Sequence, residues 1–156
     1  MTKIRYDMTQ PGKIGLALLL IFLSISSIRA QEFLDWDQIG MVSWKEEYDA
    51  SLGYDVTIGE YDERIMAIEG KDVIVKGYVI PLDALGISYA LSRTSFASCF
   101  FCGEAGPETV MELRVPPKSI APDRLKNTLL TFQGRFQIRI SNEKGLHYVL
   151  LNATEK

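Results

Sequence analysis

The residues from Asp72 to Leu82 constrain the fold of this chain most strongly. They are rich in β-branched side chains, they contain one glycine, Gly77, and Pro81 closes them. β-branched residues favour the extended backbone of strands, and a glycine inside such a run indicates a bend or a bulge. The sequence therefore predicts a long, bent β-strand here.

Four further segments downstream have strand character. They cover residues 87–93, 109–115, 128–140 and 146–152. Gly134 lies in the middle of the third segment and predicts another bend, and residues 141–145 read Ser-Asn-Glu-Lys-Gly, a strong turn signal. A short helix capped by Ser119 is predicted over residues 119–126.

Five strands, a long first one with a glycine bend, and a short helix before the fourth predict a mainly β fold. The pattern matches a five-stranded OB-like barrel, in which bent strands take part in both halves of a small closed sheet. A β-sandwich is the alternative. The barrel is expected to occupy residues 70–156, and residues 31–69 are expected to pack on it as a helical or irregular segment.

The segment 31–69 is polar and aromatic. Ile39 and Val42 lie at helical spacing from Trp36, which predicts a short helix near residues 35–48. Asp62 can cap a second short helix that carries Ile65 and Ile68 on one side and that Gly70 would end. We expect the aromatic residues of this segment to cover one end of the core: Trp36, Trp44, Tyr48, Tyr54 and Tyr61.

Residues 1–30 have the three parts of a signal peptide. A basic start is followed by an apolar run over residues 14–28 and by Ile28-Arg29-Ala30, a passable cleavage site. As a helix the apolar run would span roughly 22 Å, which is short of the ~30 Å of a bilayer core. We expect cleavage, a periplasmic or secreted protein, and no stable membrane span after cleavage.

Charge argues against a nucleic-acid partner. The whole chain has a formal net charge of −3, and removing residues 1–30 takes away four basic residues and one acidic residue, which leaves −6. A polyanion-binding protein needs a basic footprint, because neutralising phosphates supplies most of such affinity. An envelope protein or a second copy of the chain is the expected kind of partner.

The order of motifs resembles a family of small exported bacterial proteins that is known only as a domain of unknown function. The resemblance covers nearly all of residues 31–156 and is carried by Trp36 with Ile39, Ile68–Val73, Gly77–Leu82, Tyr89–Leu91, Pro107 after a cysteine loop, Phe132–Gly134 and Tyr148–Ala153. It implies an OB-like barrel, and some family members occur in gene neighbourhoods concerned with metal uptake. Many relatives carry Cys-x-His in the loop where this chain has Cys-x-x-Cys-Gly.

The two cysteines, Cys99 and Cys102, both lie in this loop. A structural disulfide would close only four residues, and the chain-entropy model gives it about 1.9 kcal/mol. A redox pair would need a helix N-terminus to lower the thiol pKa, whereas Gly103, Gly106 and Pro107 do not support a helix. Neither role is favoured by these observations, so a structural disulfide and thiol–disulfide activity are kept as two alternatives to a metal site.

A metal site is the preferred interpretation. Two thiolates three residues apart can bind one soft ion, and a glycine after the second suits a tight turn around it. The expected zinc site combines Cys99 and Cys102 with His147 and a carboxylate, Glu104 or Glu108, with Asp83 as a further candidate. Two chains could also share one ion through four cysteines.

No other motif carries catalytic chemistry, so the protein is expected to be a binding domain, although its enzymatic status stays open. Three phenylalanines lie in or beside the loop: Phe96, Phe100 and Phe101. They either anchor the loop on the barrel or contact a partner. In the second case the protein would be a partner-binding module of an envelope complex.

Overall fold

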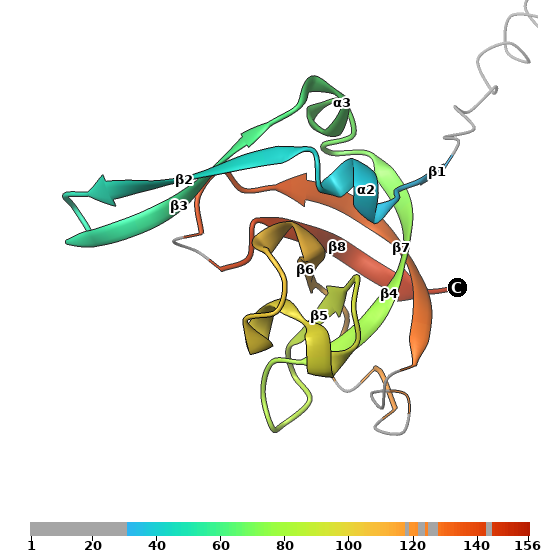
Figure 1. Ribbon diagram of the computed structural model, residues 1–156. Helices are drawn as coiled ribbons and strands as arrows, with labels where there is room; N and C mark the ends of the chain where they lie inside the picture. The colour runs from blue at the N-terminus through green and yellow to red at the C-terminus, as the bar shows by residue number, and fades with distance from the viewer. Residues whose placement is uncertain (1–30, 118, 122–123, 125–127, 143–144) are drawn as a thin grey trace, which may run out of the picture. The chain divides into compact units, whose positions relative to one another are not determined.

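Five strands close into a barrel in the computed structural model of the protein (Figure 1). They are β4 (Asp72–Pro81), β5 (Tyr89–Ser92), β6 (Val110–Leu113), β7 (Leu129–Ile138) and β8 (Tyr148–Glu155). The hydrogen-bonded order is β4-β5-β6-β8-β7, and β7 pairs back with β4. The β6–β8 pair is parallel and the other four pairs are antiparallel. The predicted mainly β, five-stranded OB-like barrel is confirmed, and the alternative of a β-sandwich is wrong.

The structure describes residues 31–117, 119–121, 124, 128–142 and 145–156, and residues 31–156 form one unit. The signal peptide predicted over residues 1–30 and half of the helix predicted over 119–126 lie outside the described residues. In the described part of the chain, every helix is too short or too polar to span a bilayer.

The barrel closes through a bend of strand β4 at Gly77. Strand β4 pairs with β7 from Asp72 to Tyr78 and with β5 from Tyr78 to Pro81, so it turns from one partner to the other beside Gly77. A Cβ on Gly77 would lie 2.7 Å from the carbonyl oxygen of Ser92, which is closer than real Cβ contacts. The predicted bend is therefore confirmed, and it depends on the missing side chain.

The barrel interior holds large aromatic and aliphatic side chains. Phe136 stacks on Tyr148 with 5.7 Å between the ring centroids. The Tyr148 hydroxyl donates to the carbonyl of Ile39 at 2.8 Å, and the Trp36 indole donates to the carbonyl of Lys76 at 2.7 Å. These two hydrogen bonds satisfy the polar atoms that the aromatic side chains carry into the core. They also fix the segment 31–69 to the barrel.

The helix predicted over residues 35–48 is wrong beyond Ile39. Helix α2 (Trp36–Ile39) is followed by strand β2 (Val42–Asp49), which pairs antiparallel with β3 (Tyr54–Tyr61). The backbone N–H of Gly40 bonds the carbonyl of Trp36, and Asp62 N–H then bonds the carbonyl of Met41, so the chain leaves the helix and enters the hairpin.

The hairpin turn is built by Asp49 and Gly53. The Asp49 carboxylate accepts the Ser51 hydroxyl at 2.6 Å and the backbone N–H groups of Ser51 at 2.8 Å and Leu52 at 3.2 Å. These bonds, with the hydroxyl as the largest cause, lower the pKa of Asp49. Gly53 has φ +78°, a conformation that favours glycine. Residues 49–53 thus form a tight turn, which specifies two paired strands where the sequence spacing had indicated one helix.

Helix α3 (Glu63–Met66) follows the hairpin, as predicted from Asp62. The Asp62 carboxylate accepts the backbone N–H of Arg64 at 2.9 Å and also binds the Arg64 guanidinium, and these bonds lower the Asp62 pKa to about 2. Ile65 and Ile68 are buried on one side of the helix. A two-residue strand, β1 (Glu32–Phe33), pairs parallel with β4.

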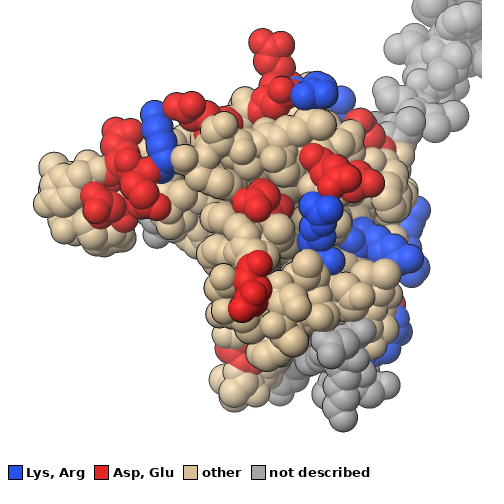
Figure 2. Space-filling model, in the orientation of Figure 1, with Lys and Arg blue, Asp and Glu red and all other residues tan. Residues whose placement is uncertain are grey.

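The outer part of the β2–β3 hairpin extends beyond the barrel, and its tip is exposed, with Tyr48 64% and Tyr54 52% accessible (Figure 1). Figure 2 shows acidic side chains gathered over this hairpin. Its inner end is attached to the barrel because the Gly59 N–H donates to the carbonyl of Ile140 at 3.0 Å.

Candidate functional site

The cysteine loop connects β5 to β6 through short 3-10 turns. These are η1 (Phe96–Ser98), η2 (Phe100–Cys102) and η3 (Pro107–Thr109). In η2 the Cys102 N–H donates to the carbonyl of Cys99 at 3.0 Å, and Gly103 ends the turn with φ +78°. Side chains three residues apart lie above one another in a 3-10 turn. The sequence therefore brings the two cysteines together by local geometry alone.

The two sulfur atoms are 3.9 Å apart and both cysteines are free. A disulfide needs about 2.05 Å, so this is a pair of separate thiols. Cys99 is fully buried, whereas Cys102 is exposed and its thiol donates to the carbonyl of Phe96 at 3.1 Å. The pair thus has one thiol covered by the barrel and one at the surface.

A small apolar cluster outside the main core covers Cys99. Its buried members are Ile80, Ala90 and Val110, and Phe100 and Leu146 pack against them. Phe100 is therefore an anchor of the loop. Phe96 and Phe101 remain 56% and 45% exposed beside the thiol pair, so they could meet a partner.

Burial and the neighbouring thiol raise the pKa of Cys102. Desolvation is the larger cause, the hydrogen bond and charge of Cys99 come next, and the charge of Glu104 adds to them. A raised pKa disfavours the thiolate that a redox nucleophile needs. A bound cation would have the opposite effect, because it would stabilise the negative charge on both sulfurs.

His147 lies on the other side of its strand end, away from the cysteines. Its neighbour Leu146 packs against the apolar cluster over Cys99. The His147 ring packs on Trp44 with 4.4 Å between the centroids, and its Nδ1 lies 3.2 Å from the carbonyl oxygen of Arg139. The predicted cluster of His147 with the cysteines is therefore not formed within one chain.

The imidazole of His147 is 3% exposed, and burial lowers its pKa. The Tyr61 hydroxyl donates to the same Arg139 carbonyl at 2.8 Å and lies 3.3 Å from Nδ1. The Nε2 atom is buried and has no hydrogen-bond partner among the described residues. His147 is thus held as a neutral ring in an aromatic environment.

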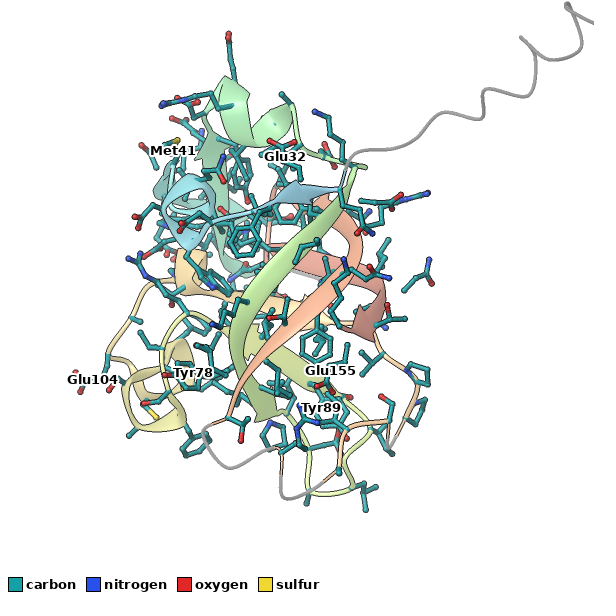
Figure 3. The ribbon with its side chains drawn as sticks, turned by 90° about the vertical axis from the view of Figure 1, so that its right-hand side faces the viewer. Glu32, Met41, Tyr78, Tyr89, Glu104 and Glu155 are labelled. Carbon is teal, nitrogen blue, oxygen red and sulfur yellow. The ribbon has the colours of Figure 1, made fainter. Side chains whose placement is uncertain are left out.

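The predicted carboxylate ligands are also directed elsewhere. Glu108 accepts the indole N–H of Trp44 at 2.9 Å, which ties the end of the cysteine loop to β2. Glu104 is exposed, and Figure 3 shows it at the outer edge of the loop, pointing away from the barrel. Asp83 accepts three backbone N–H groups of the β4–β5 loop, those of Leu85, Ile87 and Ser88.

Within the described ranges, no group of three histidine, cysteine or acidic side chains could hold a metal ion. Of the predicted ligands the structure brings together Cys99 and Cys102. It instead forms an unpredicted cluster of Trp44, Tyr61, His147 and Glu108 at the inner end of the hairpin. The alternation of residues 42–49 was the sequence signal that could have placed Trp44 on a strand.

Comparison with known proteins shows the fold. No family model and no curated protein matches this sequence. The structure is similar to the crystal structure of a DUF3299 family protein from Pseudomonas aeruginosa PAO1, with a TM-score of 0.51 and 13% sequence identity. The match covers 81% of this chain and 97% of that chain. The barrel architecture is thus shared with a bacterial protein of a family of unknown function.

Proposed function

We propose that this protein is a non-enzymatic binding module whose Cys99–Cys102 loop holds one soft metal ion, with zinc as the reference ion. The supporting observation is the 3.9 Å between the two sulfur atoms. A tetrahedral zinc ion with Zn–S bonds of about 2.3 Å separates two of its sulfur ligands by about 3.8 Å. The distance between the two free sulfur atoms therefore matches the distance that binding to one zinc ion would require.

The other ligands would come from outside the loop. His147 and Glu108 are engaged with Trp44, Tyr61 and the Arg139 carbonyl, so neither completes the site from within the chain. Water, an envelope protein or two thiolates of a second copy would fill the remaining positions. Phe96 and Phe101 would then give the incoming protein an apolar surface beside the metal.

A reversible disulfide is the second candidate, and the pairing of an exposed with a buried thiol favours it. The Cys102 thiolate would attack a disulfide of an envelope protein and release one thiolate. The Cys99 thiolate would then attack the Cys102 sulfur and release the second. The loop would lose two electrons and two protons, and the partner disulfide would be reduced to two thiols.

We also propose that the module acts in the periplasm or outside the cell. The basic start, short apolar run and Ala30 of residues 1–30 support export. Mass spectrometry of the protein recovered from an envelope fraction should show Gln31 as its first residue. Recovery of the uncleaved chain from the cytosol would contradict this.

Zinc content tests the metal proposal. The purified, reduced protein is dialysed after addition of zinc and assayed by elemental analysis, and we expect one zinc per chain, or one per two chains if copies share it. The Cys99→Ser/Cys102→Ser variant should lose the zinc. Glu108→Gln should keep it, because that carboxylate binds Trp44. Equal zinc in the double cysteine variant would refute the proposal.

A thiol count separates the second candidate from the first. Reduced protein without metal is incubated with oxidised glutathione, and the disulfide function predicts that both thiols are lost together and recovered with dithiothreitol. The metal function predicts that bound zinc slows this loss. Thiols that stay free without metal under oxidising conditions would exclude the disulfide function.

A further inference from the structure

A cavity of about 600 Å³ is lined by residues 151–154 of β8 and by residues that directly follow β6 and β7. Its volume falls within the roughly 300–1,000 Å³ that small-molecule sites occupy. Val115 and Leu151 form part of an apolar wall, and the side chains of Arg114 and Arg139 enter the same lining. An apolar cavity with a few charged groups is the general form of a ligand site.

The charged groups of this cavity are held in place before any ligand arrives. Arg114 Nε lies 2.7 Å from one oxygen of Glu112, and Arg139 Nη1 lies 2.9 Å from the other oxygen. Arg139 Nη1 also donates to the carbonyl of Leu146. Glu112 therefore holds the Arg114 guanidinium through Nε, and the Arg114 side chain is still 57% exposed, so solvent and ligands can reach it. A guanidinium fixed in this way is preorganised to bind a planar anion.

The floor of the cavity is a β-bulge. On either side of the bulge, Arg135 pairs with Leu151 and Gln133 pairs with Thr154. Two residues of β8, Asn152 and Ala153, therefore lie opposite the single residue Gly134 of β7. Asn152 has φ +51°, the only positive value among the described non-glycine residues. Bulges and left-handed residues occur preferentially beside functional sites, where they redirect a side chain. Here the bulge turns the exposed Asn152 side chain outward.

Asn152 lines two adjoining cavities. A second cavity of about 290 Å³ shares Asn152 and Thr154 with the first, and Arg135 lies in its wall. The amide group of Asn152 can donate hydrogen bonds to a ligand in either space. The bulge therefore places a polar donor at the junction of the cavities, opposite the apolar wall.

We propose that this cavity binds a small molecule with one carboxylate group and an apolar body. The carboxylate would pair with the terminal nitrogens of Arg114 and accept from Asn152, while the body would contact Val115 and Leu151. A planar carboxylate matches the fork of the guanidinium. A dianionic phosphate fits less well, because the Glu112 carboxylate in the same cluster would repel it.

Calorimetric titration with sodium octanoate tests this proposal, with 1-octanol as the neutral ligand of equal length. We expect octanoate to bind the folded protein about 10-fold or more tightly than octanol, since bonds to charged groups contribute this much. Arg114→Gln should weaken octanoate binding by about 10- to 100-fold. Arg93→Gln is the matched control and should bind normally, because Arg93 pairs with Asp37 outside the cavity.

Asn152→Gly provides a second variant that keeps the fold, since glycine adopts φ +51° without strain. It should weaken octanoate binding without lowering the unfolding temperature. Absence of octanoate binding at millimolar concentration would overturn the proposal. Equal affinity for octanoate and octanol, or unchanged octanoate affinity in both Arg114→Gln and Asn152→Gly, would also overturn it.

Discussion

Lowering the pH from 7 to 5 should destabilise the protein through His147. This imidazole is 3% exposed, its Nε2 atom has no hydrogen-bond partner, and burial lowers its pKa below the ordinary value near 6.5. The described groups around it are the Trp44 ring, the Tyr61 hydroxyl and the Arg139 carbonyl, and Glu108 is reached through Trp44. No carboxylate contacts the ring to favour the imidazolium.

The sign and size of the effect follow from proton linkage. Below pH 6.5 the unfolded chain binds a proton at His147 that the folded state resists, so the free energy of unfolding falls as the pH falls. The slope is at most about 1.4 kcal/mol per pH unit for one proton. Between pH 6.5 and pH 5 the loss of unfolding free energy attributable to His147 is therefore at most about 2 kcal/mol.

Urea unfolding at pH 7 and pH 5 measures this loss. Carboxylates elsewhere also titrate in acid, so the informative quantity is the difference between the wild-type protein and His147→Gln, which cannot be protonated at this position. We expect the wild-type protein to lose more unfolding free energy than the variant on acidification, by up to about 2 kcal/mol. An equal loss in both proteins would refute the description of His147 as a buried neutral ring.

Three further substitutions test the fold, each by its change in the free energy of unfolding in urea. Tyr148→Phe removes the buried hydrogen bond to Ile39 and should cost about 1–3 kcal/mol, and an unchanged midpoint would contradict that bond. Gly134→Ala should cost about 1–3 kcal/mol, because its Cβ would lie 2.7 Å from the Leu151 carbonyl oxygen, and a neutral effect would exclude the tight crossing. Trp44→Phe should cost about 1 kcal/mol or more in the wild-type background and less when Glu108 is already alanine, because only the wild-type background loses the hydrogen bond as well as ring packing on His147, and an equal cost in both would contradict that bond.

The barrel strands could be predicted because their signals are local. The β-branched run of β4 ends at a proline, its glycine coincides with the bend, and the two faces of β6 differ in polarity. Each property belongs to residues close in sequence.

The hairpin β2–β3 was not predicted because its sequence carries two competing patterns. Trp36, Ile39 and Val42 have helical spacing, but the helix itself ends at Ile39. The residues Asp49 to Gly53 contained a stronger indication of a hairpin, because an aspartate followed four residues later by a glycine is typical of a tight turn. The alternation of Val42, Trp44 and Tyr48 with polar residues was a further strand signal, and it competes with the helical spacing because it begins at the same Val42.

The proximity of Cys99 to Cys102 is likewise a local property of a turn, and the sequence predicted it. The position of a third ligand is different, because it depends on which way a distant strand end faces. Leu146 and His147 are adjacent, yet one packs over Cys99 and the other packs on Trp44. A shift of this segment by one residue along its neighbours would exchange the positions of Leu146 and His147. No feature in the sequence of residues 141–147 indicates which of the two positions each residue takes.

X-ray absorption at the zinc edge tests the central proposal most directly, because it counts the sulfur atoms bound to the ion. The zinc-loaded protein should show two sulfur neighbours at about 2.3 Å, or four if two copies share the ion. Both sulfur signals should disappear in the Cys99→Ser/Cys102→Ser variant. A first shell made only of nitrogen and oxygen atoms at about 2.0–2.2 Å would contradict metal binding by the cysteine loop.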